Sequence, residues 1–284
     1  MARTNERMES GMGRTKPTTL SQGVVIFAFN NEATDYIAMA AWSAKNIRRH
    51  LNLPVAIVTN DPNAAAQYKF EHIIVTAADT GGSRHFADYG TNVTWHNAGR
   101  VNAYALSPFD QTIVLDADYV VASSQLLNLF DIPQQFAAFR ESFDPASMMN
   151  LPTFGAHNMP MWWATVMMFR RDTVSQYIFD SMQMIRANWQ HYRDLYGIHE
   201  TNYRNDYALS IAIALVAGDQ QLVHQIYWPM LNVMPDHKLT SIDTDSYVIE
   251  YTNAEGRLKT MSWAGLDFHA MCKKHLEAIV AAAG

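Results

Sequence analysis

The sequence lacks the features that mark exported, membrane-spanning or zinc-stabilised proteins. It contains a single cysteine, Cys272, so no internal disulfide can form, and no CxxC or Cys/His zinc pattern occurs. The longest apolar run, 211–217, is far shorter than the roughly 20 residues of a transmembrane helix. Residues 1–22 lack the apolar block of a signal peptide. These absences predict a soluble, cytoplasmic protein without a membrane span.

The sequence also has no excess of positive charge. Its net charge is -6 and its pI is near 6.0, which argues against a protein whose main task is holding nucleic-acid backbones. Dinucleotide-binding GxGxxG, nucleophile-elbow GxSxG and zinc-helix HExxH motifs are absent, and Gly11–Lys16 is an incomplete phosphate loop that follows no strand. Dehydrogenase and hydrolase functions therefore have no support.

What is present is a series of short apolar runs that alternate with helix-like segments. Hydrophobic residues make up 49% of the chain, enough for a packed core. Residues 1–21 have no hydrophobic period and predict a disordered tail. We predict strands over 23–29, 54–59, 71–76, 111–115, 135–140 and 162–169, a hairpin from strands 247–251 and 258–263, and helices over 35–50, 92–106, 172–196, 205–216 and from about 270. This alternation predicts one Rossmann-like α/β domain over 22–284, with a mainly parallel central sheet flanked by helices.

The sharpest local signal is the triplet Asp116-Ala117-Asp118, which follows the predicted strand 111–115. Two carboxylates one residue apart at a strand end can converge on one hard divalent cation, whose other ligands are then diphosphate oxygens. Ligands of open α/β sheets bind at this edge. Elsewhere such a pair commonly caps a helix or faces water, but the apolar residues on both sides of the triplet favour a site embedded in the core.

With this triplet, the sequence resembles the glycogenin-like branch of the GT-A fold glycosyltransferases over roughly residues 23–275. In that family, a strand ending in Asp-Ala-Asp carries the nucleotide-sugar site. The loop Phe29-Asn30-Asn31-Glu32, followed by Tyr36, is similar to the family's first loop, where the backbone and a Tyr hold the base. Arg100 lies where the family places a basic residue near the phosphates. The resemblance implies donor-binding roles for five residues: Phe29, Asn30, Tyr36, Arg100 and Ala117.

Later segments extend the resemblance. Asn205-Asp206 is similar to the family's Asp-Gln segment, which opens a helix beside the sugar, and this implies a catalytic role for Asp206 alongside Asp118. Asp267-Phe268-His269 resembles the strand that carries the metal-binding histidine. Lys273 or Lys274 matches the family's downstream lysine on the diphosphate. The Gln after Asp206 and the family's usual His-Phe-x-Gly-x-x-Lys-Pro-Trp segment are absent.

Each residue taken alone also has an ordinary structural explanation. Asp206 can be the N-cap of the helix that it begins, and His269 a core histidine where a strand meets a helix. Arg100 can lie on a solvated helix face, and Tyr36 can simply pack. The functional and structural explanations make different predictions about which of these side chains meet in space.

We therefore predict a metal-dependent hexosyl- or pentosyltransferase that moves a sugar from a nucleoside diphosphate sugar to an acceptor hydroxyl. Mn²⁺ or Mg²⁺ would be held by Asp116, Asp118 and His269. The resemblance implies a UDP-sugar donor, retention at the anomeric carbon, a nucleotide-binding half over 22–121 and an acceptor half over 122–284.

The acceptor and the oligomeric state stay open. Compact sequences of this kind are also similar to phage-encoded sugar transferases, some of which modify hydroxymethylated bases in DNA in a host cytoplasm. The acceptor is therefore such a base, a saccharide, a lipopolysaccharide precursor or a protein hydroxyl. The alternatives are a nucleotidyltransferase of similar α/β fold and a non-catalytic nucleotide-binding relative.

Overall fold

The computed structural model describes residues 20–78, 82–86, 90–146, 148–150, 152–218 and 220–283. The elements of the first half are β1 (Gln22–Phe27), α1 (Tyr36–Leu51), β2 (Val55–Thr59), α2 (Pro62–Ala65), β3 (His72–Val75), β4 (Gly82–Phe86), β5 (Thr91–Trp95), η2 (Asn97–Asn102), α3 (Ala103–Leu106), β6 (Gln111–Asp116), β7 (Tyr119–Val120), η3 (Gln125–Phe130), β8 (Phe136–Phe139) and β9 (Ser142–Asp144). The remaining elements are β10 (Met148–Asn150), β11 (Thr153–Phe154), β12 (Met159–Pro160), β13 (Trp163–Arg170), α4 (Thr173–Ala187), α5 (Trp189–Tyr196), α6 (Asn205–Ala217), β14 (Val223–Gln225), β15 (Met230–Val233), β16 (Lys238–Ser241), β17 (Ser246–Thr252), β18 (Leu258–Ala264), β19 (Phe268–Ala270) and α7 (Lys273–Ala283).

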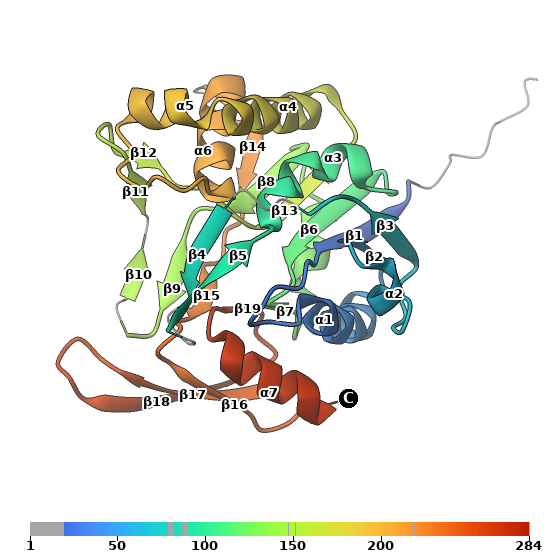
Figure 1. The fold of residues 1–284 in the computed structure, drawn as a ribbon, viewed down its shortest axis with the longest axis vertical. Helices are drawn as coiled ribbons and strands as arrows, with labels where there is room; N and C mark the ends of the chain where they lie inside the picture. Colours follow the sequence, from blue (N-terminus) through green and yellow to red (C-terminus); the bar gives the residue numbers. More distant parts are fainter. Residues whose placement is uncertain are drawn as a thin grey trace, which may run out of the picture.

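A seven-stranded sheet in the order β14-β8-β13-β6-β1-β2-β3 forms the centre of the molecule. Neighbouring strands run parallel in the β6-β1-β2-β3 part and between β8 and β14. Only β13 breaks this direction in the central sheet, because it pairs antiparallel with both β6 and β8. The predicted mixed α/β fold with a mainly parallel central sheet flanked by helices is confirmed (Figure 1).

Both faces of this sheet are covered, which explains the continuous apolar runs of its strands. Alternate residues of β6 enter different cores: Ile113 and Leu115 pack with α1 on one face, whereas Val114 packs with α4 and α6 on the other. Gly23 in β1 leaves room for the Phe109 ring, which a Cβ would overlap. Parallel pairing places the carboxyl ends of β1 and β6 side by side, with Phe27 in register with Asp116.

A second sheet crosses this edge and has the order β10-β9-β15-β19-β7. β7 directly follows the Asp-Ala-Asp triplet, and it pairs antiparallel with β19 through Tyr119 and His269. The amide of Ala270 donates a 2.9 Å hydrogen bond to the carbonyl of Asp118. Residues separated by about half the chain length therefore meet at the carboxyl edge of the central sheet.

Three strands, β16, β17 and β18, form a separate antiparallel sheet, which lies with α7 at the opposite end of the molecule from α4, α5 and α6 (Figure 1). The hairpin predicted from 247–251 and 258–263 is confirmed as β17 and β18, with Tyr251 opposite Lys259. None of the helices in the described part of the chain is long and apolar enough to cross a membrane.

Several predicted boundaries are wrong. The helix predicted over 92–106 is replaced by β5, η2 and α3, because Thr-Asn-Val-Thr-Trp is a β-forming segment that pairs with β4. The helix predicted over 172–196 is divided at Asn188 into α4 and α5. The last helix begins at Lys273 rather than at about 270, because 268–270 form β19. The tail predicted over 1–21 lies outside the described residues except for Leu20 and Ser21.

Candidate functional site

Two carboxylates and one imidazole converge where the two sheets meet. Asp116 ends β6, Asp118 opens the turn into β7, and His269 comes from the paired strand β19. One ligand atom from each lies within 4.8 Å of the others, and Nε2 of His269 is 3.4 Å from Oδ2 of Asp118. Carboxylate oxygen and imidazole nitrogen suit Mn²⁺, and Mg²⁺ accepts the same oxygens, so these residues fit a divalent cation.

Two basic side chains contact the same carboxylates. Lys273, at the start of α7, forms an ion pair with Asp118, and Arg100, in η2, forms one with Asp116. Asp118 is 6% exposed and Arg100 is 2% exposed, so both pairs are shielded from solvent. We refer to Asp116, Asp118, His269, Arg100 and Lys273 as the carboxylate cluster.

Arg100 is therefore not on the solvated helix face that its sequence context allowed. Burial lowers its pKa to about 10, against the opposing attraction of Asp206 and Tyr203, and it stays charged at neutral pH. Its Nη1 also donates a 2.7 Å hydrogen bond to the carbonyl of Ala164 in β13. This bond ties η2 to the strand beside β6.

Ala164, whose carbonyl contacts Arg100, contacts Asp206 through its amide. This amide donates to Oδ1 of Asp206 at 2.9 Å, and Arg204 forms a 2.8 Å ion pair with Oδ2 of Asp206. Burial alone would raise the pKa of Asp206, but Arg204, the Ala164 amide and Arg100 together lower it. Asp206 is therefore an anion beside the carboxylate cluster, and it does not cap α6, whose N-cap position is Arg204.

The predicted base-binding residues form a separate group at the end of β1. Phe29 is 4% exposed, which leaves mainly its backbone for a ligand, and Oδ1 of Asn30 accepts the amide of Ile37 at 2.9 Å. Tyr36 begins α1 and packs partly against the core. The loop is fixed at its outer side by Glu32, which accepts a 2.8 Å hydrogen bond from the Thr94 hydroxyl. Ala117 is 5% exposed between the two aspartates.

Three neighbouring residues had no assigned role in the sequence. Arg204 sets the charge of Asp206, Asp267 accepts the amide of Ala122 at 2.8 Å, and Asn232 lies in register with His269 on β15. Burial raises the pKa of Asp267 to about 6, although hydrogen bonds from Ala122 and Ser123 oppose the shift. Of these three residues, only Arg204 could have been found from the sequence, because it is two residues from Asp206. The positions of Asp267 and Asn232 depend on contacts between distant strands, which the sequence does not show locally.

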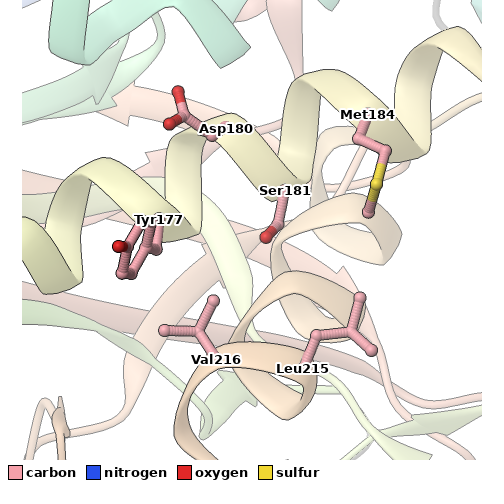
Figure 2. A pocket seen from close by; sticks show the side chains of 6 residues that line it. All are labelled: Tyr177, Asp180, Ser181, Met184, Leu215 and Val216. Carbon is pink, nitrogen blue, oxygen red and sulfur yellow. The ribbon is translucent and has the colours of Figure 1, made fainter.

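A shallow groove between α4 and α6 lies away from this site. It is lined by six residues: Tyr177, Asp180, Ser181, Met184, Leu215 and Val216 (Figure 2). Asp180 is the one charged side chain among them, and Leu215 is nine residues from Asp206, about 14 Å along α6. Because no lysine or arginine is among these six residues, the groove does not suit a diphosphate.

Comparisons with known proteins give structural matches only. No protein-family model matches the chain, and no curated protein matches it. Among solved structures, the glycosyltransferase GlyE of Streptococcus pneumoniae TIGR4 is 15% identical, with a TM-score of 0.45, over 74% of this chain and 46% of GlyE. Mouse xyloside xylosyltransferase 1 is 12% identical, with a TM-score of 0.45, over 73% and 85% of the two chains. The neighbours are glycosyltransferases.

A third match is the galactosyltransferase LgtC in complex with donor and acceptor sugar analogs, at 14% identity and a TM-score of 0.44 over 75% of this chain and 76% of LgtC. The chain spans less than half the length of GlyE. Similarity of this size does not assign an activity, which has to be argued from the site.

Proposed function

We propose that the chain is a metal-dependent glycosyltransferase that moves a sugar from a nucleoside diphosphate sugar, a UDP-sugar, to an acceptor hydroxyl. The observation that carries the proposal is the convergence of Asp116, Asp118 and His269 at the carboxyl edge of a mainly parallel sheet. These three residues would hold Mn²⁺ or Mg²⁺, which supplies Lewis-acid stabilisation of the diphosphate leaving group when bound.

The basic residues of the carboxylate cluster would bind the diphosphate directly. Lys273 and Arg100 form ion pairs with the carboxylates that would hold the cation, so their charges would lie where the leaving group becomes negative. Phosphate oxygens are good acceptors for both side chains. The chain thus offers two fixed cations that oppose the charge developing on the departing nucleotide.

Asp206 would face the transferred sugar. Its pKa is lowered by Arg204, the Ala164 amide and Arg100, so the carboxylate is ionised, and the Ala164 amide holds it in place. An anion at this point orients a sugar hydroxyl and stabilises the positive charge that develops on the anomeric carbon. We assign Asp206 this catalytic role together with Asp118, and we infer retention of the anomeric configuration.

The loop after β1 would hold the nucleoside. Asn30 fixes the start of α1 through the Ile37 amide, which leaves the Phe29 and Asn30 backbone, Tyr36 and Ala117 beside the base and ribose. In this arrangement residues 22–121 form the nucleotide-binding half of one domain. Residues 122–284 form the acceptor half, and they also contribute His269 and Lys273 to the donor site.

The experiment is a donor-hydrolysis screen over UDP-, GDP- and CDP-sugars with Mn²⁺ or Mg²⁺. We expect one UDP-sugar to be hydrolysed and EDTA to abolish the reaction, with restoration by added Mn²⁺. Turnover of a nucleoside triphosphate with a sugar phosphate would instead indicate the nucleotidyltransferase. Absence of both metal-dependent hydrolysis and metal-dependent UDP binding would refute the proposal and favour a non-catalytic relative.

A further inference from the structure

Arg140 occupies the same edge of the central sheet as the carboxylate cluster. It directly follows β8, whose last residue, Phe139, is in register with Trp163 of β13. The sheet order places β13 between β8 and β6, so Arg140 lies two strands, about 10 Å, from the end of β6. It is therefore beside the site, on the side opposite β1 and the proposed nucleoside.

The guanidinium of Arg140 has a fixed position but no charged partner. Its central carbon lies 5.4 Å from the centre of the Trp162 ring, within the range of a cation–π contact. Within the described residues, Arg140 forms no hydrogen bond or ion pair, and its Nε is shielded from solvent without a partner. Its neighbour Glu141 instead accepts a 2.9 Å hydrogen bond from Gln225. We refer to Arg140, Trp162 and Trp163 as the Arg140 cluster.

A partly buried arginine without a partner differs from the other arginines near the site. Near the site, Arg100 and Arg204 have carboxylate partners. At the opposite edge of the central sheet, Arg170 also has partners, because it donates to the carbonyl oxygens of Phe130 and Ile132. A guanidinium is always charged, and its planar fork matches carboxylate and phosphate oxygens. Contact with the Trp162 ring restrains the guanidinium and reduces the entropy lost when an anion binds.

Hydrogen bonds connect Trp162, the ring that contacts this arginine, to the reaction site. The amide of Trp162 donates to the Ser210 hydroxyl at 2.7 Å, and that hydroxyl donates to the Asp206 carbonyl at 2.7 Å. Two residues further along the chain, Ala164 donates to the Asp206 carboxylate. The Arg140 cluster is thus held rigidly against the residue proposed to face the transferred sugar.

We propose that Arg140 binds an anionic group, a carboxylate or a phosphate, on an acidic acceptor saccharide; this inference rests on the proposed function. Trp162 and Trp163 would provide an apolar face for the sugar ring beside that anion. The acceptor is a saccharide rather than DNA because Arg140 is one isolated cation next to Glu141 in a chain of net charge -6. DNA binding requires a row of cations along the backbone.

The experiment uses pairs of sugar probes that differ in charge: methyl glucoside and methyl glucuronide, methyl galactoside and methyl galacturonide, and glucose and glucose 6-phosphate. Their dissociation constants for the full chain, with UDP and Mg²⁺ present, are measured by ligand-observed NMR titration. We expect the charged member of at least one pair to bind about tenfold more tightly or better, the usual effect of a charge-assisted hydrogen bond.

Arg140→Ala should remove this preference. Arg140→Lys should keep part of it, because lysine retains the charge but not the fork. Arg257→Ala is the matched control, since Arg257 pairs with Glu255 on an exposed hairpin turn and should leave the preference unchanged. Thermal unfolding of each variant verifies that it is folded.

The inference is overturned if no charged probe is preferred, including the case in which none binds, or if the preference survives in folded Arg140→Ala. Tighter binding of an oligonucleotide containing 5-hydroxymethylcytosine than of every charged sugar would also overturn it. Donor hydrolysis is measured in the same preparation. If hydrolysis occurs without a charge preference, only this inference fails; if no donor is bound or hydrolysed, the proposed function fails and this inference fails with it.

Discussion

The carboxylate cluster and the Arg140 cluster lie at the same edge of the central sheet, but their charged groups are in opposite situations. In the carboxylate cluster every charge has a partner: Arg100 contacts Asp116, and Lys273 contacts Asp118. In the Arg140 cluster the only charge lies over an indole ring and has no carboxylate or carbonyl partner among the described residues.

This difference indicates two kinds of binding site. A ligand of the carboxylate cluster has to replace an existing ion pair. A cation and a diphosphate would therefore bind there together, the cation to the carboxylates and the diphosphate to the basic side chains. A ligand of the Arg140 cluster adds a partner without displacing one. Variants that remove individual charges can break or sharpen this distinction.

The largest expected effect comes from Asp118→Asn. The amide keeps the shape of the side chain but removes one carboxylate from the metal triad and the partner of Lys273. We expect donor hydrolysis to fall by about 10³-fold or more, because Lewis-acid stabilisation contributes several kcal/mol. Initial rates at saturating Mn²⁺ measure the loss. Asp131→Asn, at an exposed position after η3, is the control, and equal rates for the two variants would exclude Asp118 from the site.

Arg100→Met tests whether the pairs of the carboxylate cluster are exchangeable. It leaves Asp116 without its buried partner, and we expect a loss of about 3 kcal/mol in the free energy of unfolding. Because a cation can then pair with Asp116, Mn²⁺ should raise the melting temperature of the variant more than that of the wild type.

Denaturant titrations with and without Mn²⁺ measure both effects. Arg257→Met, which removes an exposed ion pair, should change stability by less than about 1 kcal/mol. If Mn²⁺ stabilises wild type and Arg100→Met equally, the pair between Arg100 and Asp116 is structural and does not exchange with a metal.

Asp267, two residues before His269 in the chain, predicts a pH effect. The pKa of Asp267 is about 6 in the folded chain, above the usual 3.8, so the folded state favours its protonated form. The contribution of Asp267 to stability is therefore full below about pH 4 and is lost as the pH rises through 6. Between pH 4.5 and 7.5 the expected loss is about 2 kcal/mol.

Asp267→Asn should remove this loss, because a carboxamide does not ionise between these pH values. Its oxygen can still accept the Ala122 amide, so the hydrogen bond is kept. Urea titrations at the two pH values, in EDTA, compare the variant with the wild type. If the variant shows the same pH dependence as the wild type, another group causes it.

The sequence predicted the parts of the fold that depend on local pattern. The apolar runs of β1 and β6 and the amphipathic period of α1 led to the right elements, because both faces of the central sheet are buried and Asp35 caps the helix. The helix prediction for 92–106 was wrong because it gave more weight to Asn92 as a helix cap than to the β-forming residues of the segment. The break at Asn188 was not predicted because the helical period continues on both sides of it.

The candidate site was predictable only where its residues are neighbours in sequence or share a family pattern. Asp116 and Asp118 follow from the strand that precedes them, but the approach of His269 depends on the pairing of β19 with β7. The isolation of Arg140 was hidden, because Glu141 is adjacent in sequence and only the structure shows that it binds Gln225 instead. Partner choice across strands is a tertiary property that no local spacing encodes.

The smallest expected effect distinguishes two adjacent lysines. Lys273 contacts Asp118 and donates a 3.1 Å hydrogen bond to the Ala270 carbonyl, whereas Lys274 is exposed. If Lys273 exchanges from Asp118 to the diphosphate, Lys273→Met should lower kcat/KM for donor hydrolysis by about tenfold, the loss of one charge-assisted contact. The matched variant Lys274→Met should stay within about twofold of wild type, since an exposed charge is screened.

Whether the loss of activity in Lys273→Met lies in kcat or in KM tests the exchange of Lys273 from Asp118 to the diphosphate. A lysine that binds the diphosphate equally before and during reaction changes KM, whereas one that moves onto the leaving group as charge develops changes kcat. Because Lys273 is paired with Asp118 before the donor arrives, we expect the loss mainly in kcat. An effect confined to KM would mean that Lys273 leaves Asp118 on donor binding, and no effect at all would make the ion pair purely structural.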